Sequence, residues 1–404
     1  MRDTLTTTAG ESELPRWFAT VFDTISRIRV GSWSWVLPDG REFRADGTEP
    51  GPHAHLVVRD ADVFARIVRD GELGFAEAYM DGHWDTPDLQ AVLDVALLNN
   101  ENMARQFTGA AVVRVIERLR HWMNRNTKKG SRRNIAAHYD LGNAFYSRWL
   151  DSSMTYSSAL FSGTQESLET GQRNKYAAIC DAIAAPQGGH VLEIGCGWGG
   201  FAEYAAGERG LRVTGLTISQ AQHDYAKERI FNAGLAERVD IVLRDYRDER
   251  GRYDGVASIE MFEAVGEKFW PVYFDTLRER LNPDARASLQ IITIADRLFD
   301  GYRRSVDFVQ KYIFPGGMLP SPAALRVQTR RAGLDLVGSI EFGESYSDTL
   351  RRWRSRFNEA WDEISSMGFD ERFHRMWNFY LASCASCFAA GTTDVTQVTL
   401  RRPA

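Results

Sequence analysis

The sequence of 404 residues predicts an α/β protein in which a small α+β N-terminal domain precedes a doubly wound domain with helical cap insertions. From residue 189 onward, apolar runs of about six residues alternate with segments of helix length, which is typical of a buried parallel sheet with right-handed crossovers. A glycine-rich turn follows the first of these runs. With 44% hydrophobic and 25% charged residues, the composition is that of a packed globular protein and argues against disordered, collagen-like or disulfide-scaffold classes.

The N-terminal domain is expected to span residues 1–113. Short strand-like runs occur at Ser32–Leu37 and His55–Val58, and the sequence Pro38-Asp39-Gly40 predicts a turn directly after the first run. A helical pattern follows at Asp60–Arg69. This mixture predicts a small α+β module that differs from the strand and helix alternation of the later chain.

Residues 114–133 form a basic segment between the two domains, with eight Lys and Arg against the single acid Glu117. Apolar residues at helical spacing begin the segment, and polar residues end it. One interpretation is an interfacial helix, which anionic lipid head groups attract by about 1 kcal/mol per basic residue near the surface. The other is a solvated interdomain linker that packs through its apolar stripe, and the sequence leaves both open.

Residues 134–404 are expected to form the doubly wound domain. Its elements are predicted in this order: strand His190–Ile194, helix Phe201–Arg209, strand Leu211–Leu216, helix Ser219–Ala233, strand Val239–Leu243, strand Tyr253–Ser258, helix Phe269–Leu281 and strand Ala287–Ile294. Two further stretches, roughly Ala295–Pro322 and Gly343–Ala390, interrupt the closing elements and are long enough to cap a pocket.

Net charge, cysteine content and the N-terminal sequence limit the partners and the cellular compartment that can be expected for the protein. A net charge of -5 is too balanced for a protein whose whole surface binds nucleic acid. Four cysteines are too few for a disulfide framework, and we interpret Cys384 and Cys387 as buried helix residues, with no metal site predicted. Because residues 1–16 lack an apolar signal region and no apolar stretch approaches the roughly 18 residues of a spanning helix, we expect a cytoplasmic protein, peripherally associated with the membrane.

The glycine-rich turn lies in Val191–Gly200, where Gly195, Gly197 and Gly199 follow a strand and precede a helix. Glycines at this place let a ligand approach the backbone closely. An NAD site is disfavoured because Glu193 lies inside the strand before the glycines, and because the second strand ends at Thr217 where a ribose-binding acid is expected.

This Glu-x-Gly-x-Gly-x-Gly arrangement after a strand resembles that of class I S-adenosylmethionine-dependent methyltransferases. The sequence Arg244-Asp245-Tyr246 after the next strand is compatible with a contact to the adenine of that cofactor. A purely structural strand-to-helix turn is the alternative explanation of the glycines.

Motifs along most of the chain are similar to those of the cyclopropane-fatty-acyl-phospholipid synthase family, which includes the mycolic acid cyclopropane synthases. The motifs are His138–Tyr146, Met154–Ser157, Leu192–Gly200, Val213–Ser219 with Gln222, Glu260–Gly266, Lys311–Gly317 and Asp394–Val398. In addition, Gly74–Gly82 and Trp84 resemble the extra N-terminal domain of the phospholipid-acting synthases. The resemblance implies a Rossmann-like methyltransferase domain preceded by a lipid-binding accessory domain.

The resemblance also implies a reaction and a cofactor site. Members of this family add a methylene group from S-adenosylmethionine to the double bond of an unsaturated acyl chain, so the implied partners are phospholipid acyl chains and a membrane surface, with a homo-oligomer possible. The implied cofactor contacts are Tyr156 and Ser157 for the methionine end, Glu193, Gly195, Gly197 and Gly199 for methionine and ribose, Thr217 and Gln222 for the ribose, and Asp245 and Tyr246 for the adenine.

The resemblance further implies that bicarbonate serves as general base, held by a glutamate, a cysteine, a histidine and a tyrosine. Glu263 and Tyr346 match that pattern as catalytic residues, and Ser158 replaces the cysteine. Ile292 replaces the histidine and contributes no side-chain donor. An aromatic lining would exclude water from the reacting chain, and its candidates are Phe262, Phe269, Trp270, Phe308, Tyr312, Phe314, Tyr346 and Trp353.

Several outcomes remain open from the sequence. Loss of a proton from the added methyl group gives a cyclopropane, whereas other fates of the same cation give a methylene or methyl branch. A lipid-binding protein that has kept the fold without the chemistry is a non-enzymatic alternative. A nucleic-acid methyltransferase is suggested by the basic segment, but the Asn/Asp-Pro-Pro-Tyr type of motif is absent, so no nucleic-acid partner is expected.

Overall fold

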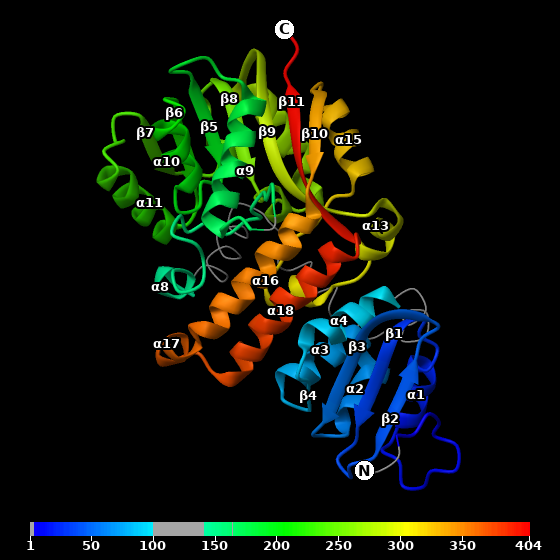
Figure 1. The fold of residues 1–404 in the computed structure, drawn as a ribbon. Coiled ribbons are helices and arrows are strands. Elements are labelled where there is room, and N and C mark those ends of the chain that lie inside the picture. The colour runs from blue at the N-terminus through cyan, green and yellow to red at the C-terminus, as the bar shows by residue number, and fades with distance from the viewer. Residues whose placement is uncertain (1–3, 100–140, 164) are drawn as a thin grey trace. The chain divides into compact units, whose positions relative to one another are not determined.

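A computed structural model describes residues 4–99, 141–163 and 165–404 (Figure 1). The chain forms two compact units. The first contains the N-terminal residues together with Arg304–Ile313 and Trp361–Ala390, and the second contains the other described residues from 141 onward. The basic segment 114–133 lies outside the described residues. The two units are therefore interleaved along the sequence instead of following one another.

The first unit contains a four-stranded sheet in the order β2-β1-β3-β4. Strand β1 pairs parallel with β3 and antiparallel with β2, and β3 pairs antiparallel with β4. The predicted strands, turn and helix of the α+β module are confirmed. The elements of this unit are β1 (Val30–Val36), β2 (Glu42–Asp46), β3 (Glu49–Val58), β4 (Trp84–Asp85), α1 (Phe18–Ile25), α2 (Asp62–Asp70), α3 (Glu72–Met80), α4 (Leu89–Leu98), α14 (Phe308–Tyr312), α17 (Trp361–Ser366) and α18 (Glu371–Ala389).

Side-chain contacts explain why two late segments belong to the first unit. The carboxylate of Glu77 on α3 accepts hydrogen bonds from Lys311 Nζ and from the Tyr312 hydroxyl, both at 2.7 Å. On α18, Arg375 donates to Asp85 at 2.6 Å. Because both contacts are between charged groups that are partly shielded from water, they hold α14 and α18 to the N-terminal module more firmly than fully exposed ion pairs would.

The second unit is built on a seven-stranded sheet in the order β10-β11-β9-β8-β5-β6-β7. Its predicted strands are confirmed. One expectation needs correction, because β11 runs antiparallel to both β9 and β10, so the sheet is mixed and not parallel throughout. The strands are β5 (His190–Ile194), β6 (Arg212–Thr217), β7 (Val239–Leu243), β8 (Tyr253–Ile259), β9 (Leu281–Ile294), β10 (Asp335–Glu341) and β11 (Thr393–Arg401).

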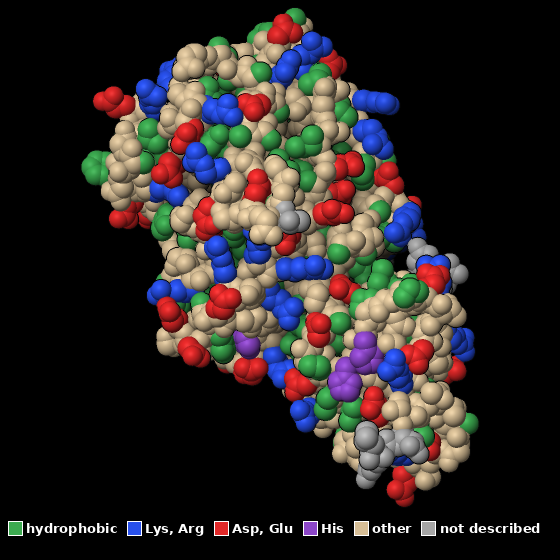
Figure 2. Space-filling view, in the orientation of Figure 1, with side chains coloured by type: hydrophobic (Ala, Val, Ile, Leu, Met, Phe, Trp, Pro, Cys, Tyr) green, Lys and Arg blue, Asp and Glu red, His purple; other side chains and the backbone are tan. Residues whose placement is uncertain are grey.

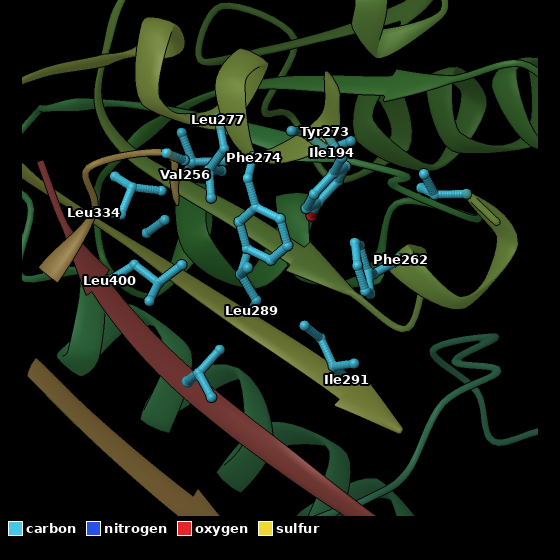
Figure 3. Packing of buried hydrophobic residues seen from close by; sticks show 14 of the residues in the cluster. Ile194, Val256, Phe262, Tyr273, Phe274, Leu277, Leu289, Ile291, Leu334 and Leu400 are labelled. Atoms are coloured by element: carbon cyan, nitrogen blue, oxygen red, sulfur yellow. The ribbon is translucent and has the colours of Figure 1, made fainter. Parts of the chain in front are cut away.

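Helices cover both faces of this sheet, as a doubly wound fold requires. Each face of the sheet carries its own hydrophobic core, because successive side chains along a strand point to opposite faces. On β5, Val191 belongs to the first core, with residues of α9, α10 and α11, and Leu192 belongs to the second core, with residues of α12 and α15. Figure 3 shows the second core, with Phe274 and Leu289 among its members. The helices and 3-10 turns of this unit are α8 (Asn143–Tyr146), α9 (Leu168–Ile183), α10 (Gly200–Gly207), α11 (Gln220–Asn232), η1 (Tyr246–Asp248), η2 (Phe262–Ala264), η3 (Glu267–Phe269), α12 (Trp270–Arg280), α13 (Asp296–Tyr302), α15 (Pro322–Arg331) and α16 (Gly343–Glu359).

The visible surface carries acidic and basic side chains that are interspersed, with no extended area of one sign on this face (Figure 2). This distribution agrees with the nearly balanced charge of the sequence. Within the described part of the chain, no helix has both the length and the apolar character that crossing a membrane would need.

Candidate active site

The site lies where the carboxyl ends of β5, β6 and β8 meet. These strands are parallel and adjacent, so the residues that follow each strand come together at one edge of the sheet. The glycine-rich loop follows β5, Ser219 begins α11 after β6, and Glu260 directly follows β8. Ligands of open α/β sheets bind at this edge, which makes it the natural place for a cofactor.

The three glycines of the loop differ in the space that is available to a side chain at each position. A Cβ at Gly195 would lie 2.7 Å from Met261 Cγ, so the loop packs directly against the residue that follows Glu260. A Cβ at Gly199 would lie 3.1 Å from the Cβ of Ala226, which brings α10 close to α11. At Gly197, by contrast, φ is +51° and no described atom lies within 4 Å of the Cβ position. Gly197 therefore faces open space, as close approach of a ligand to the backbone requires.

Glu193, in the strand that leads into the loop, and Lys175 on α9 are two buried ionisable groups that interact electrostatically. Glu193 is 2% exposed, and its Oε2 has no hydrogen-bond partner among the described residues. Burial raises the pKa of Glu193 to about 8, an effect that the nearby Lys175 opposes. Burial also lowers the pKa of Lys175 to about 7, and its Nζ donates to Ser157 Oγ at 2.7 Å. An unpartnered buried carboxylate fits the positively charged methionine end of S-adenosylmethionine, because a cation there would restore its ionised form.

The expected ribose contacts are next to one another, and the two expected adenine contacts, Asp245 and Tyr246, follow β7. Thr217 Oγ1 donates to Gln222 Oε1 at 2.9 Å, and both side chains are buried. Asp245 accepts hydrogen bonds from the Arg247 backbone and guanidinium, with distances of 2.6 to 3.0 Å. Its carboxylate therefore caps the η1 turn. Tyr246 packs against Tyr273 in the second core, and its buried hydroxyl has no described hydrogen-bond partner.

An aromatic cluster surrounds Tyr156, with the rings of Tyr146, Trp149, Trp353 and Phe314 at centroid distances of 5.3 to 6.3 Å. Tyr146 and Trp149 were not singled out from the sequence for this role. Four residues that were proposed for an aromatic lining lie in other clusters. Phe262 (Figure 3) and Trp270 are 1% and 2% exposed in the second core, while Phe308 and Tyr312 belong to the first unit.

Glu260 is the centre of a hydrogen-bond cluster next to the loop. Its Oε1 accepts from the Ser158 backbone N–H at 2.8 Å and from Gln290 Nε2 at 2.7 Å, and its Oε2 accepts from the Tyr346 hydroxyl at 2.6 Å. Ser158 Oγ instead donates to the Ala159 carbonyl. Thus Tyr346 and Ser158, which were expected to hold an anion, both bind the carboxylate of Glu260.

Glu263 lies apart from that cluster but contacts the same strand, β9. Its Oε1 accepts from the Ile292 backbone N–H at 2.5 Å, and its Oε2 is buried without a described partner. Burial and the neighbouring Glu260 raise the pKa of Glu263 to about 8. The carboxyl of Glu263 therefore carries a proton near neutral pH.

Glu260 and Lys175 are two ionisable residues of the site that the sequence reasoning did not select as site residues. Both carried a signal. Glu260 is an acid directly after the buried strand β8, at the strand end where ligands of this fold bind. Lys175 lies on the apolar stripe of α9, in register with Leu168, Ile179 and Ile183, and a lysine at such a position needs a buried partner.

Comparisons with known proteins agree with this geometry. The family model for mycolic acid cyclopropane synthetase matches residues 126–398. The tuberculostearic acid methyltransferase of Mycobacterium tuberculosis is 38% identical over 382 residues, covering 89% of this chain and 86% of the relative. The cyclopropane-fatty-acyl-phospholipid synthase of Escherichia coli is 36% identical over 358 residues, with coverage of 86% and 88%.

Solved structures give the same result. A crystal structure of a mycolic acid cyclopropane synthase in complex with S-adenosylhomocysteine and CTAB superposes with a TM-score of 0.64 and 26% identity. The match covers 67% of this chain and 98% of that chain. From the family model, these relatives and the architecture of the site, the chain belongs to the mycolic acid cyclopropane synthetase family and is an S-adenosylmethionine-dependent methyltransferase.

Proposed function

We propose that this enzyme transfers a one-carbon unit from S-adenosylmethionine to the double bond of an unsaturated fatty acyl chain of a phospholipid. The observation that supports this most is the combination, at one end of the sheet, of two buried carboxyl groups, Glu260 and Glu263, with the aromatic cluster around Tyr156. Negative charge beside an apolar aromatic surface suits a substrate that is hydrocarbon and becomes cationic during the reaction.

The roles of the protein groups follow from this chemistry. S-adenosylmethionine supplies an electron-poor methyl carbon, and an alkene is a weak nucleophile toward it. Glu193 would hold the methionine end, with Thr217 and Gln222 at the ribose. The aromatic rings would keep water from the cationic chain, which water would otherwise trap. The carboxylates would stabilise the cation and accept its proton.

The test is an assay of the purified enzyme with S-adenosylmethionine that carries a trideuterated methyl group. We expect label in the acyl chains of dioleoyl phospholipid vesicles and none in distearoyl vesicles, because only the former contain a double bond. Mass spectrometry of the intact lipids and of the released fatty acids measures both. Label that is found only in a head group, or equally in saturated chains, would contradict the proposal.

Formation of a methyl or methylene branch is a second candidate outcome. Two observations favour it: Ile292 provides no side-chain donor at the position where the resemblance implies a histidine, and one relative with 38% identity is named a methyltransferase. The same assay distinguishes the products. Two retained deuteriums indicate a cyclopropane or an exocyclic methylene, which mild hydrogenation then separates, whereas three indicate a methyl branch.

We also propose that the enzyme works at a membrane surface, to which residues 114–133 contribute. Replacing Arg125, Lys128, Lys129, Arg132 and Arg133 with Gln is expected to reduce sedimentation with anionic vesicles, most strongly at low salt. Phosphatidylcholine vesicles serve as the control, since their neutral surface offers the basic residues no electrostatic attraction. Unchanged sedimentation of the variant with anionic vesicles would leave this segment as a linker only.

A further inference from the structure

The Glu260 carboxylate is held in place by groups from three separate parts of the chain. Its partners come from the segment before α9 (Ser158), from β9 (Gln290) and from α16 (Tyr346). Gln290 is itself oriented, because its Oε1 accepts from Gln397 Nε2 on β11 at 3.0 Å. A carboxylate offers about four lone-pair sites, and these three contacts leave one site on Oε2 without a partner among the described residues.

The backbone at Glu260 is strained. Its φ is +47°, a left-handed conformation that is unfavourable for a residue other than glycine. The conformation is fixed by the Glu260 N–H, which donates to the Gln290 carbonyl at 2.8 Å. A strained backbone conformation persists only where many surrounding contacts hold it in place, and such conformations are concentrated at functional sites. Gly195 packs against Met261, so the strained residue directly adjoins the cofactor loop.

The neighbouring carboxyl groups of Glu260 and Glu263 differ in how well their surroundings stabilise a negative charge. Glu260 accepts three hydrogen bonds and lies near the Lys175 ammonium. Glu263 accepts a hydrogen bond from the Ile292 backbone N–H and has a buried Oε2 with no described partner. Burial raises the pKa of both groups, and the charge of Glu260 raises that of Glu263 further. When two close acids cannot both ionise, the better supported one carries the charge. Here that acid is Glu260.

We propose that Glu260 is a catalytic base that is built into the chain and accepts the proton released after the acyl chain has been alkylated. This inference rests on the proposed function. The π electrons of the double bond form the new bond to the transferred carbon, and the electron pair of the broken carbon–sulfur bond stays on sulfur. A C–H bond of the transferred methyl group then gives its electron pair to the cationic carbon, which closes a ring, or a C–H bond of a chain carbon next to the cationic carbon gives its pair to form a double bond. In either case the proton passes to Glu260 Oε2. The proton returns to water when the product leaves.

A built-in base has a consequence for small anions. Tyr346 and the Ser158 N–H already donate to Glu260, so these donors are not free to hold a bicarbonate ion. The wild-type enzyme should therefore be equally active in carbonate-depleted buffer and in buffer with added bicarbonate. Glu260→Gly should open space for an anion and also relieve the left-handed strain, because glycine adopts this conformation without cost.

The experiment compares wild type, Glu260→Gln, Glu260→Gly and Tyr346→Phe in the oleoyl assay, with S-adenosylhomocysteine affinity measured by calorimetry as the check on folding. We expect both Glu260 variants to bind S-adenosylhomocysteine normally and to lose about 10²- to 10⁴-fold in turnover, the range for a positioned acid or base. Formate, acetate and bicarbonate should restore Glu260→Gly increasingly in that order of basicity. Tyr346→Phe keeps the carboxylate, so its lower activity should not respond to added anions.

The outcomes separate this inference from the proposed function. No labelled acyl chains with wild type would contradict the proposed function itself. Active wild type together with near-normal Glu260→Gln, or with a Glu260→Gly that binds S-adenosylhomocysteine but no anion restores, would overturn only the role of Glu260. Loss of wild-type activity on carbonate depletion would show that an external anion is the base. If Glu260→Gly does not fold, the turnover of Glu260→Gln and the activity of the wild type in carbonate-depleted buffer still test whether Glu260 is the base.

Discussion

Gly197→Val is expected to abolish binding of S-adenosylhomocysteine while the protein remains folded. The Cβ position of Gly197 has no described atom within 4 Å, so the branched side chain meets no group of the described residues and enters the space that we assign to the cofactor. Left-handed backbone is unfavourable for valine, so a loss of stability of about 1–3 kcal/mol is also expected. Titration calorimetry should show no binding heat, and circular dichroism should show a cooperative melt.

Gly234→Val is the matched control for this variant. Gly234 has φ +68° and also no described atom within 4 Å of its Cβ position, but it is exposed and lies just beyond α11, away from the loop. The control therefore carries the same backbone strain without entering the site. It should melt at a temperature similar to that of Gly197→Val and bind normally. Normal binding by Gly197→Val would mean that the cofactor does not approach this loop.

Glu263→Gln is expected to reduce turnover by an amount that depends on pH. The pKa of Glu263 is raised to about 8, so below that pH the wild-type group is neutral and the amide is a close mimic. Above it, the wild type gains a second negative charge beside the cationic chain, and the variant does not. We expect a few-fold reduction near about pH 6.5 and about 100-fold near about pH 9, the scale for losing a positioned electrostatic group.

The measurement is kcat as a function of pH at saturating S-adenosylmethionine. Glu267→Gln is a suitable control, because the ion pair of Glu267 on η3 with Arg303 is partly exposed, so the variant should not affect turnover. A Glu263→Gln profile parallel to that of the wild type would assign the pH dependence to another group and leave Glu263 as a structural partner of the Ile292 N–H.

Local patterns were sufficient to predict much of the second unit. The strand at Val239–Leu243 and the strand at His190–Ile194 have the predicted bounds. The second is buried along most of its length, whereas the first, at the edge of the sheet, alternates buried and exposed residues at its start. The glycines of the loop were also identified correctly as positions with special backbone requirements. Such features depend on neighbours within a few residues, which the sequence displays directly.

Sequence patterns do not show which protein groups an individual side chain contacts. Asp245 follows β7 as expected, but its carboxylate binds Arg247 two residues away. Phe262 and Trp270 are aromatic residues close to the motif of Glu263, yet both belong to the core, because the direction in which a side chain points depends on how its element packs. The type of residue at a motif position therefore does not predict which groups its side chain will contact in the folded protein.

By itself, the sequence determined the α/β class, the order of β5 to β9, the glycine loop and the family resemblance. The tertiary structure alone decided the antiparallel course of β11, the membership of Arg304–Ile313 and Trp361–Ala390 in the first unit, and the surroundings of Glu260. The donors of Glu260 in Ser158 and Tyr346 are 102 and 86 positions away along the chain. Contacts over such separations arise only when the packed sheet brings distant strand ends to one edge, so no local pattern can show them.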